Sequence, residues 1–386
     1  MGYIQQMTIS QKQFMALLRA GLWGKEADAE LFRGGVDWKT VFSIASEQTV
    51  AVIVADGIET LPPDLWPPKE VVMKLMMLRM KTGQMHALLN STLNKIVRAL
   101  DAEKVHSVLL KGQGVAQNYL KPESRSCGDI DLYTGVNGYE KACAVIEGLN
   151  NEEHKPGQEC EHHMHLSLNG VEVEVHRKTS FLHGRRMDAN FQQWTRQSLD
   201  ELFGCDALEV WYNDGTAVTL PPATYNAFFI LHHAVRHMTT EGVGFRQICD
   251  WVMLLHRYYA EIDAELLAKK LKELRMERIW NEFGRLAVGF LGLPASELPL
   301  APAKLTPGRK THELLRHIFL SGNFGRFDAN GRDRMPRPYL VRKWHSFTFQ
   351  SLRLMKLFNL FPGYSLSYMW NWFTGAIVRL IMQSDR

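Results

Sequence analysis

Apolar residues recur at helical spacing through most of residues 8–104. The pattern stops at Pro62-Pro63 and then resumes in a long helix over residues 68–102. That helix is rich in methionines, which we expect to fill its core-facing side with flexible side chains; an adaptable binding surface is the alternative. The methionines are Met73, Met76, Met77, Met80 and Met85. We therefore predict an N-terminal helical subdomain over residues 1–104.

Between residues 105 and 181 the pattern changes to short apolar runs that alternate with helices. Strands are expected at 107–111, 129–134, 163–168 and 171–177, and helices at 113–120 and 138–149. The Asn169-Gly170 pair predicts a hairpin that brings His163 or His165 opposite the strand that follows. The expected fold class is α/β (α+β), with a small mixed sheet and flanking helices as the core between N-terminal and C-terminal helical subdomains.

After an irregular stretch, helical patterns return in a predicted C-terminal subdomain over residues 182–330. Helices are expected at 221–237 and 245–258, and one or two more within 263–291. Residues 331–386 form a basic, aromatic tail with three open interpretations: a core helix, a membrane-surface helix, or a contact for a nucleic-acid acceptor. Asn371 and Arg379 interrupt the one run that approaches transmembrane length, so no span is predicted.

Composition narrows the class of protein. The 386 residues are 46% hydrophobic and 22% charged, which is typical of a globular chain with two or three subdomains. A net charge of +4 does not by itself indicate a nucleic-acid partner. Five scattered cysteines predict neither a disulfide framework nor a structural zinc site, and residues 1–10 do not resemble a signal peptide. We therefore expect a cytoplasmic protein.

Carboxylates gather on two of the expected strands. Side chains alternate across a strand, so Asp129 and Asp131 share one face. The alternation over 171–177 places Glu172, Glu174 and His176 on one polar face, and register alone does not choose between the two glutamates. Paired carboxylates repel unless they are solvated, partly protonated or bridged by a cation, and a hard divalent ion is the natural bridge.

These residues resemble a known family in both type and order. Their order resembles the motif of the nucleotidyltransferase fold shared by polymerase beta-like enzymes, aminoglycoside nucleotidyltransferases and minimal nucleotidyltransferases, which is a Gly turn, a strand with Asp-x-Asp and a later strand with one more carboxylate. Within that fold, one group has a pattern that includes Lys111-Gly112, Arg125, 128–132 and 174–176. The resemblance is to a bacterial group of largely uncharacterised nucleotidyltransferase-like proteins whose motifs run Leu-Lys-Gly, Gly-Asp-Ile-Asp-Leu and Glu-x-His. It covers about residues 105–260. The wider fold usually carries Gly-Ser at the turn, whereas this chain has Gly112-Gln113.

The resemblance implies a set of site residues. Asp129, Asp131 and Glu174 would be catalytic and would hold two Mg²⁺ ions. Contacts to a nucleoside triphosphate, with ATP expected, would come from Lys111, Gly112, Gln113, Arg125, Gly128 and His176. Plainer alternatives exist: Lys111 at a sheet edge, Arg125 in a surface loop, and His176 as a solvated strand residue.

Other histidines carry weaker signals. His162, His163 and His165 do not predict zinc, because no further residue at suitable spacing completes a ligand set. His233 and His237 share a helix face without the glutamate of a metalloprotease motif, next to His232 and Arg236. The related group carries a similar helix followed by an Arg and an Asp, which resemble Arg246 and Asp250. These residues either line a nucleotide cleft or form an ordinary interhelical salt bridge.

The leading hypothesis is a magnesium-dependent nucleotidyltransferase. It would move a nucleoside monophosphate from the triphosphate to a hydroxyl of an unidentified acceptor, which is a small molecule, an RNA or a protein, and release pyrophosphate. A catalytically silent protein that binds nucleotide or a partner in the same cleft is the alternative. The basic tail adds two further hypotheses, a tRNA-modifying or toxin-like enzyme and a weak contact with a membrane surface.

Overall fold

The computed structural model describes residues 7–149, 158–159, 163–203, 208–323, 351, 355, 357–370 and 374. The chain starts with four helices, α1 (Ile9–Trp23), α2 (Glu30–Arg33), α3 (Trp38–Glu47) and α4 (Ala51–Ile58). Thr8 caps α1, because its hydroxyl accepts a hydrogen bond from the backbone N–H of Gln11 at 3.2 Å. The predicted break at the proline pair is a short 3₁₀ turn over Pro63–Leu65.

Helices α1 and α4 cross with their backbones in contact. A Cβ placed on Gly57 would lie 2.0 Å from the carbonyl oxygen of Leu17, and one on Gly21 would lie 1.9 Å from that of Ile53. Neither gap accepts a methyl group, so both positions require glycine for packing. The close crossing brings the N-terminal helices together into one apolar layer.

Replacing Gly57 with alanine tests this crossing. We expect Gly57→Ala to lower the free energy of unfolding by about 1–3 kcal/mol, because the methyl group overpacks a rigid backbone contact. Gly83→Ala is the matched control, since a Cβ there meets nothing within 4 Å. In the middle of a helix that change stabilises by about 0.5–1 kcal/mol. Urea denaturation of both variants decides the point, and equal shifts would contradict the crossing.

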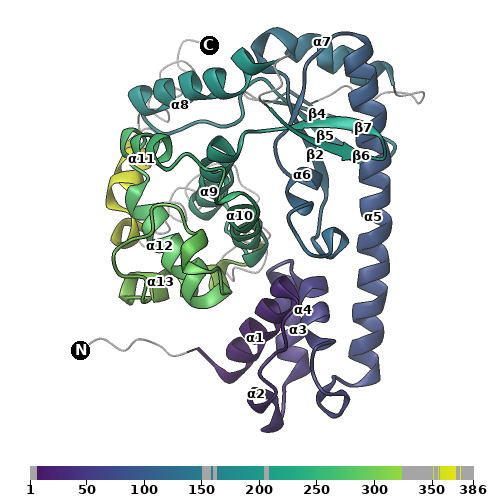
Figure 1. Ribbon diagram of the computed structural model, residues 1–386, viewed down its shortest axis with the longest axis vertical. Coiled ribbons are helices and arrows are strands. Elements are labelled where there is room, and N and C mark those ends of the chain that lie inside the picture. The colour runs from purple at the N-terminus through teal and green to yellow at the C-terminus, as the bar shows by residue number, and fades with distance from the viewer. Residues whose placement is uncertain are drawn as a thin grey trace, which may run out of the picture.

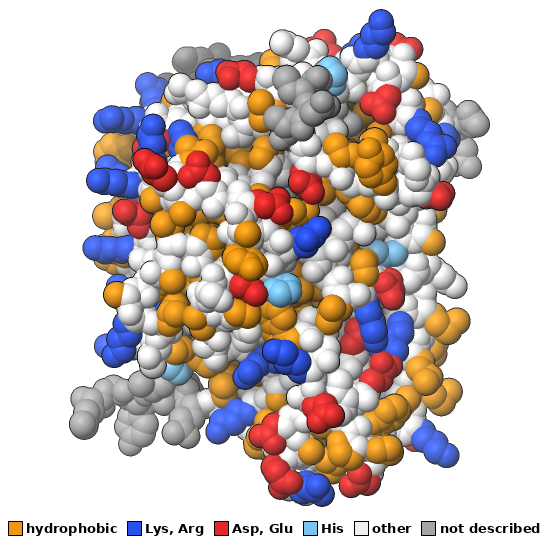
Figure 2. Space-filling model, in the orientation of Figure 1, with side chains coloured by type: hydrophobic (Ala, Val, Ile, Leu, Met, Phe, Trp, Pro, Cys, Tyr) orange, Lys and Arg blue, Asp and Glu red, His pale blue; other side chains and the backbone are white. Residues whose placement is uncertain are grey.

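Helix α5 (Lys69–Ala102) runs along one side of the molecule, from the N-terminal helices at one end to the sheet at the other (Figure 1). The prediction that its methionines form core packing is wrong for four of them. Met73, Met76, Met77 and Met80 are 59–68% exposed, whereas Leu75 between them is buried. Only one face of this half of α5 packs against α3 and α4. The four methionines lie on the other face, which is exposed to solvent. Figure 2 shows hydrophobic side chains over this half of α5.

The sheet has five strands in the order β1-β2-β5-β4-β3. They are β1 (Val108–Leu109), β2 (Asp129–Tyr133), β3 (Gln158–Glu159), β4 (His163–Leu168) and β5 (Val171–His176). Strands β2 and β5 pair in parallel, and the other neighbours pair antiparallel, so the sheet is mixed. Helices α5 and α7 (Gly135–Gly148) pack on its apolar face. The acidic side chains therefore point to the opposite face.

The prediction of an irregular stretch between the sheet and the C-terminal helices is wrong. This stretch contains α8 (Arg185–Ser198) and a hairpin of β6 (Glu209–Asn213) and β7 (Thr216–Leu220). The hairpin turns at Asp214 and Gly215, which both have positive φ, and this is the geometry that an Asp-Gly pair favours. The predicted helix over 113–120 is also too long, because α6 covers only Gln113–Ala116.

Helices form the rest of the described chain. They are α9 (Ala223–Thr240), α10 (Phe245–Tyr258), α11 (Ala264–Glu273), α12 (Glu277–Leu286) with a π-helical end at Ala287–Leu291, and α13 (Arg309–Ser321). The short turns Pro122–Ser124, Asp200–Leu202 and Ala295–Glu297 are 3₁₀. Residues 357–360 and 362–370 are helical, but most of the predicted tail lies outside the described residues. In the part of the chain that is described, no helix has both the length and the apolar character to cross a membrane.

Two apolar cores hold the molecule together. One core joins side chains from α1 to α4 with those from α8 to α13, and the other lies between the sheet, α5 and α7. The predicted fold class, a small mixed α/β core with flanking helices, is confirmed. The N-terminal and C-terminal helices share one core, and the division into segments at 104, 181 and 330 stays a prediction.

Candidate active site

A cavity of about 260 Å³ lies between the polar face of the sheet and helices α9 and α10. Its walls come from segments far apart in the sequence. The lining residues are Lys111, Gly112, Arg125, Asp129, Asp131, His163, Glu174, Ile230, His233, Arg236, His237, Glu241, Arg246, Gln247 and Asp250. The three predicted catalytic carboxylates are all among them.

Strand register brings the three carboxylates together. In the parallel pairing of β2 with β5, Asp131 lies opposite Glu174 and Asp129 lies opposite Glu172. Glu174 is partly buried and lines the cavity, whereas Glu172 is exposed and does not. Because the two glutamates share a face, this difference depends on their position along the strand. Glu174, and not Glu172, therefore lines the same cavity as the two aspartates.

Lys111 and Gly112 lie where β1 ends beside β2. The backbone N–H of Leu110 donates to the carbonyl of Asp131 at 3.0 Å, and this places Lys111 Nζ 2.8 Å from Asp131 Oδ1. Gly112 has a φ of 59° and a ψ of −119°, and a Cβ there would lie 3.1 Å from the carbonyl oxygen of Asp129. The turn therefore requires glycine for both its conformation and its close approach to β2.

The two aspartates sit in different electrostatic environments. Burial disfavours the charge of Asp131, but the Lys111 ammonium and a hydrogen bond from His176 outweigh it and hold the pKa of Asp131 well below its usual range. The charge of Asp131 and burial raise the pKa of Asp129. Ionised Asp129 is therefore destabilised in the folded protein, and a cation between the two carboxylates would relieve the repulsion.

His176 lies behind the carboxylates and does not line the cavity. Its Nε2 is 3.0 Å from Asp131 Oδ1 and 3.3 Å from Glu174 Oε2. Burial lowers the pKa of His176, but the hydrogen bonds to these two carboxylates outweigh it and raise the pKa overall. The ring is buried, so the alternative of a solvated strand residue is wrong. His176 orients Asp131 and Glu174 toward the cavity.

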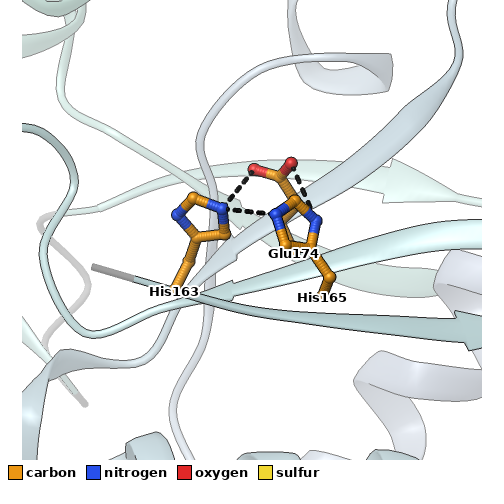
Figure 3. A group of neighbouring side chains, drawn as sticks. All are labelled: His163, His165 and Glu174. Carbon is orange, nitrogen blue, oxygen red and sulfur yellow. Dashed lines mark hydrogen bonds and ion pairs between the residues drawn. The ribbon is translucent and has the colours of Figure 1, made fainter. Parts of the chain in front are cut away.

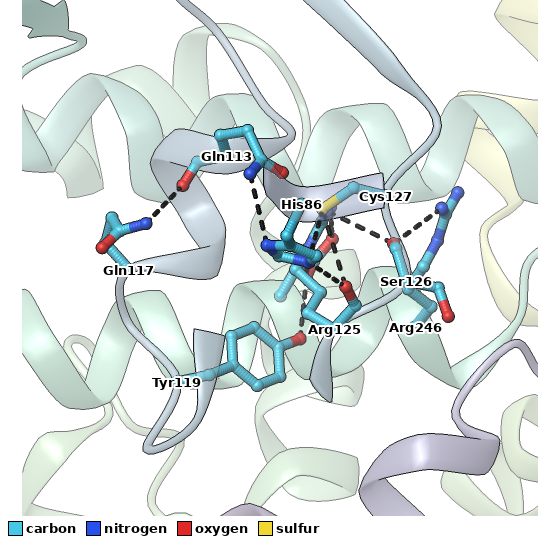
Figure 4. A network of polar contacts seen from close by, with 9 residues as sticks. His86, Gln113, Gln117, Tyr119, Arg125, Ser126, Cys127 and Arg246 are labelled. Carbon is cyan, nitrogen blue, oxygen red and sulfur yellow. Dashed lines mark hydrogen bonds and ion pairs between the residues drawn. The ribbon is translucent and has the colours of Figure 1, made fainter. Parts of the chain in front are cut away.

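Besides His176, two further predicted triphosphate contacts, Gln113 and Gly128, do not line the cavity. The side chain of Gln113 turns toward α5, where its amide nitrogen lies 3.2 Å from His86 Nδ1 (Figure 4). The same nitrogen donates to the side-chain oxygen of Asn90. Gly128 is outside the lining residues, and a Cβ there would meet nothing within 4 Å. Helix α6 has only four residues, so its dipole adds little charge near Gly112.

Arg125 is engaged in a buried ion pair. Its Nε and Nη2 donate to the two carboxylate oxygens of Asp250 at 2.7 Å each, and the Tyr119 hydroxyl donates to Oδ1 at 2.7 Å. Arg125 is 5% exposed, so its alternative placement in a surface loop is wrong. Figure 4 shows the guanidinium beside Ser126 and Cys127, which also accept hydrogen bonds from it. Its charge is largely neutralised by Asp250.

Helices α9 and α10 form the wall opposite the sheet. His233, Arg236 and His237 reach the cavity from α9, and Arg246 and Asp250 reach it from α10. The Arg236 guanidinium lies 5.2 Å from the centre of the Phe181 ring. Arg246 Nη1 donates to the carbonyl of Ser126 at 3.2 Å. Asp250 lines the cavity, and its salt bridge is to Arg125 in the loop before β2, so the predicted interhelical salt bridge is not the one it forms.

Ile230, Glu241 and Gln247 also line the cavity, and sequence reasoning missed them. Ile230 and Gln247 are ordinary residues of α9 and α10, Glu241 follows the end of α9, and none of the three carries a local motif. They line the cavity because of the way α9 and α10 pack together. The pattern of side chains along a single helix does not specify that packing. His232, one position from the cavity residue His233, points instead into the core and is fully buried.

His232 predicts a pH effect on stability. Its Nε2 lies 3.1 Å from Ser180 Oγ, and burial, together with the charge of Arg236, lowers its pKa to about 3. In the unfolded chain a histidine titrates near pH 6.5, so between pH 6.5 and about 3 only the unfolded state takes up this proton. Stability therefore falls as the pH drops through this range.

His232→Gln removes this titration while it keeps a polar side chain. Between pH 7 and pH 5 we expect the wild type to lose about 2 kcal/mol more of its free energy of unfolding than the variant loses. Urea denaturation at a series of pH values gives the two curves. Parallel curves would contradict a neutral His232 in the folded protein.

Comparison with known proteins agrees with this arrangement of residues. A family model described as "uncharacterised nucleotidyltransferase" matches residues 34–292. The chain belongs to the uncharacterised nucleotidyltransferase family. The resemblance inferred from the Lys-Gly, Asp-x-Asp and Glu-x-His motifs is thereby confirmed.

The description of the family gives neither a substrate nor an acceptor. A search of curated proteins gave no match. Among solved structures, an antigenic nucleotidyltransferase-like protein from Paracoccidioides brasiliensis is similar at 13% identity, over 53% of this chain and 92% of that chain, with a TM-score of 0.31. The substrates of this chain therefore have to be argued from the cavity itself.

Proposed function

We propose that this protein is a magnesium-dependent nucleotidyltransferase. It would transfer a nucleoside monophosphate from a nucleoside triphosphate, ATP in the first instance, to a hydroxyl of an unidentified acceptor. The observation that carries the proposal is the convergence of Asp129, Asp131 and Glu174 on one cavity that cationic side chains also line. Membership of the nucleotidyltransferase family supports the reaction class.

The donor set fits magnesium. Mg²⁺ prefers carboxylate and phosphate oxygens, and Asp129, Asp131 and Glu174 offer carboxylate oxygens at the cavity wall. The raised pKa of Asp129 shows that the aspartate pair is short of positive charge in spite of Lys111. When bound, Mg²⁺ would neutralise charge on the phosphoryl oxygens and favour the ionised form of the acceptor hydroxyl.

The remaining cations would bind the triphosphate. Arg236 and Arg246 face the carboxylates from α9 and α10, whereas Arg125 is neutralised by Asp250. Lys111 lies deepest, beside Asp131. We therefore assign the triphosphate to the space between Lys111 and the two arginines of the helical wall, where charge-assisted hydrogen bonds to phosphate are strong.

The reaction itself is a displacement at phosphorus. The acceptor oxygen forms a bond to the α-phosphorus while the bond from that phosphorus to the bridging oxygen breaks. Pyrophosphate leaves with the electron pair, and the acceptor proton passes to solvent. The protein contributes alignment and charge, because Lys111 and the arginines hold the leaving group in a cavity lined mainly by charged and polar residues.

A labelled-triphosphate assay tests the proposal. The protein is incubated with Mg²⁺ and a cell extract, once with ATP labelled at the α-phosphate and once with ATP labelled at the γ-phosphate. Nucleotidyl transfer leaves label on an acceptor only from α-labelled ATP. Label from the γ-phosphate would indicate phosphoryl transfer instead, and no retained label with any of the four nucleoside triphosphates would contradict the proposal.

One observation favours the silent binding protein as the second candidate. The Lys111 ammonium already lies 2.8 Å from Asp131, so this carboxylate has a cation without any metal. Isothermal titration with magnesium-ATP separates the two candidates. Binding of magnesium-ATP without release of pyrophosphate on any acceptor favours the silent protein. In that case Asp129→Ala changes the affinity for magnesium-ATP and has no reaction rate to lower.

A further inference from the structure

Two histidines that have no part in the proposed reaction lie beside Glu174 and form with it a group of three potential metal ligands. Strand β4 runs antiparallel to β5, with His163 opposite His176 and His165 opposite Glu174. His163 and His165 are two positions apart on one strand, so both rings project to the face that carries Glu174. Figure 3 shows the two imidazoles and the Glu174 carboxylate turned toward one another.

The spacing of the donor atoms suits one small ion. His163 Nε2 is 2.9 Å from His165 Nε2 and 3.8 Å from Glu174 Oε2, and His165 Nδ1 is 3.4 Å from Glu174 Oε1. One potential ligand atom from each residue can be chosen so that all lie within 4.8 Å of one another. Ligands that share a tetrahedral ion at about 2.1 Å lie about 3.4 Å apart, so small side-chain rotations suffice.

We propose that His163, His165 and Glu174 form a binding site for a divalent transition-metal ion of the zinc class, distinct in chemistry from the oxygen-only magnesium set. Imidazole nitrogen is a borderline-soft ligand that favours Zn²⁺, Cu²⁺, Fe²⁺ or Ni²⁺ over Mg²⁺. Three protein ligands leave a fourth position open, which is the pattern of catalytic and not of structural zinc.

The surroundings support a ligand role for Glu174 in particular. His176 Nε2 lies 3.3 Å from Glu174 Oε2 and fixes the carboxylate from behind, as an outer hydrogen bond commonly does for metal ligands. His163 lines the cavity, so the open position of the ion would face the space assigned to the nucleotide and its acceptor. His165 is 41% exposed on its side chain, which gives the ion a path from solvent.

Sequence reasoning rejected zinc here because the histidines lacked a further ligand at suitable spacing. The missing ligand is Glu174, which the hairpin pairing of β4 with β5 places directly across from His165. Glu174 also belongs to the proposed magnesium set, so the test has to separate the two sites. The metal proposal does not require the transferase activity.

Titration with Co²⁺ after chelation of the purified full-length chain tests the site. Tetrahedral Co²⁺ gives visible absorbance that reports its ligands, and we expect one ion per chain, displaced by Zn²⁺. The double variant His163→Ala/His165→Ala should weaken this binding by about 100-fold or more, because two of three ligands are lost. The matched control His106→Ala/His312→Ala removes two histidines outside the cavity and should bind like the wild type.

Asp129→Asn separates this proposal from the proposed function. Asp129 is outside the histidine set, so the variant should keep its Co²⁺ affinity while it loses magnesium-dependent nucleotide chemistry. Unchanged Co²⁺ affinity in His163→Ala/His165→Ala would overturn the metal site whatever the activity. His233 and His237 are a second close pair of histidines, with their Nε2 atoms 3.0 Å apart. If His237→Ala abolished Co²⁺ binding and His163→Ala/His165→Ala did not, the ion would belong to that pair and the proposed site would be overturned.

Discussion

Asp129→Asn is expected to lower the rate of pyrophosphate release by about 10²- to 10³-fold, the usual cost of one preorganised charge at such a site. The variant keeps the size and the hydrogen-bonding capacity of the side chain but cannot hold a cation by charge. Because Asp131 raises the pKa of Asp129, the native charge costs folding energy, and the free energy of unfolding should stay the same or rise. Lower activity with undiminished stability is the expected combination.

Glu172→Gln is the matched control. Glu172 lies opposite Asp129 in the pairing of β2 with β5, but it is exposed and outside the cavity. It loses a carboxylate from the same polar face, so pyrophosphate release should be little changed. Equal losses in Asp129→Asn and Glu172→Gln would mean that the general field of the sheet matters and not the cavity. An unchanged rate of pyrophosphate release in both variants would show that Asp129 takes no part in the reaction.

Asp250→Ala should lower the free energy of unfolding by about 3–5 kcal/mol, the cost of leaving one partner of a buried ion pair alone. Asp250 accepts two charge-assisted hydrogen bonds from Arg125 and one from Tyr119. Its removal leaves the guanidinium without its carboxylate in an environment where Arg125 is 5% exposed. Chemical denaturation followed by both fluorescence and circular dichroism measures the loss.

A double-mutant cycle provides the control for Asp250→Ala. Arg125→Leu/Asp250→Leu replaces both charges with apolar side chains and should be less destabilised than Arg125→Leu alone or Asp250→Leu alone, since no charge stays buried without a partner. Additive losses would show that the pair contributes through packing alone. If Arg125→Leu weakened nucleotide binding at full stability, Arg125 would be a triphosphate ligand, as the motif implies.

The central strands could be predicted because their side-chain alternation is strict. Val-Glu-Val-Glu-Val-His has only one way to bury its valines, and so the boundaries of β5 and the shared face of Glu174 and His176 follow from the sequence. The helix over 245–258 was likewise predicted to its ends, because apolar spacing is regular throughout. Local pattern was sufficient where one face of an element is buried and the other is not.

Contacts over long sequence distances could not be predicted in the same way. Arg125 and Asp250 are 125 positions apart, and nothing near either residue indicates its partner. The methionines of α5 have the spacing of a buried face, but the chain supplies no further layer there among the described residues. The β6–β7 hairpin was missed although Asp214-Gly215 marks its turn, because its strands are short and only half apolar.

The parallel pairing of β2 with β5 also governs when the carboxylates can meet during synthesis. Asp131 and Glu174 are 43 positions apart, since 174 − 131 = 43, and α7, β3 and β4 come between them. A nascent chain that ends before residue 171 carries the aspartate pair and lacks the third acid. Parallel strands need this crossover before they can align. Binding of a cation by all three side chains would therefore follow the completion of the sheet and could not nucleate it.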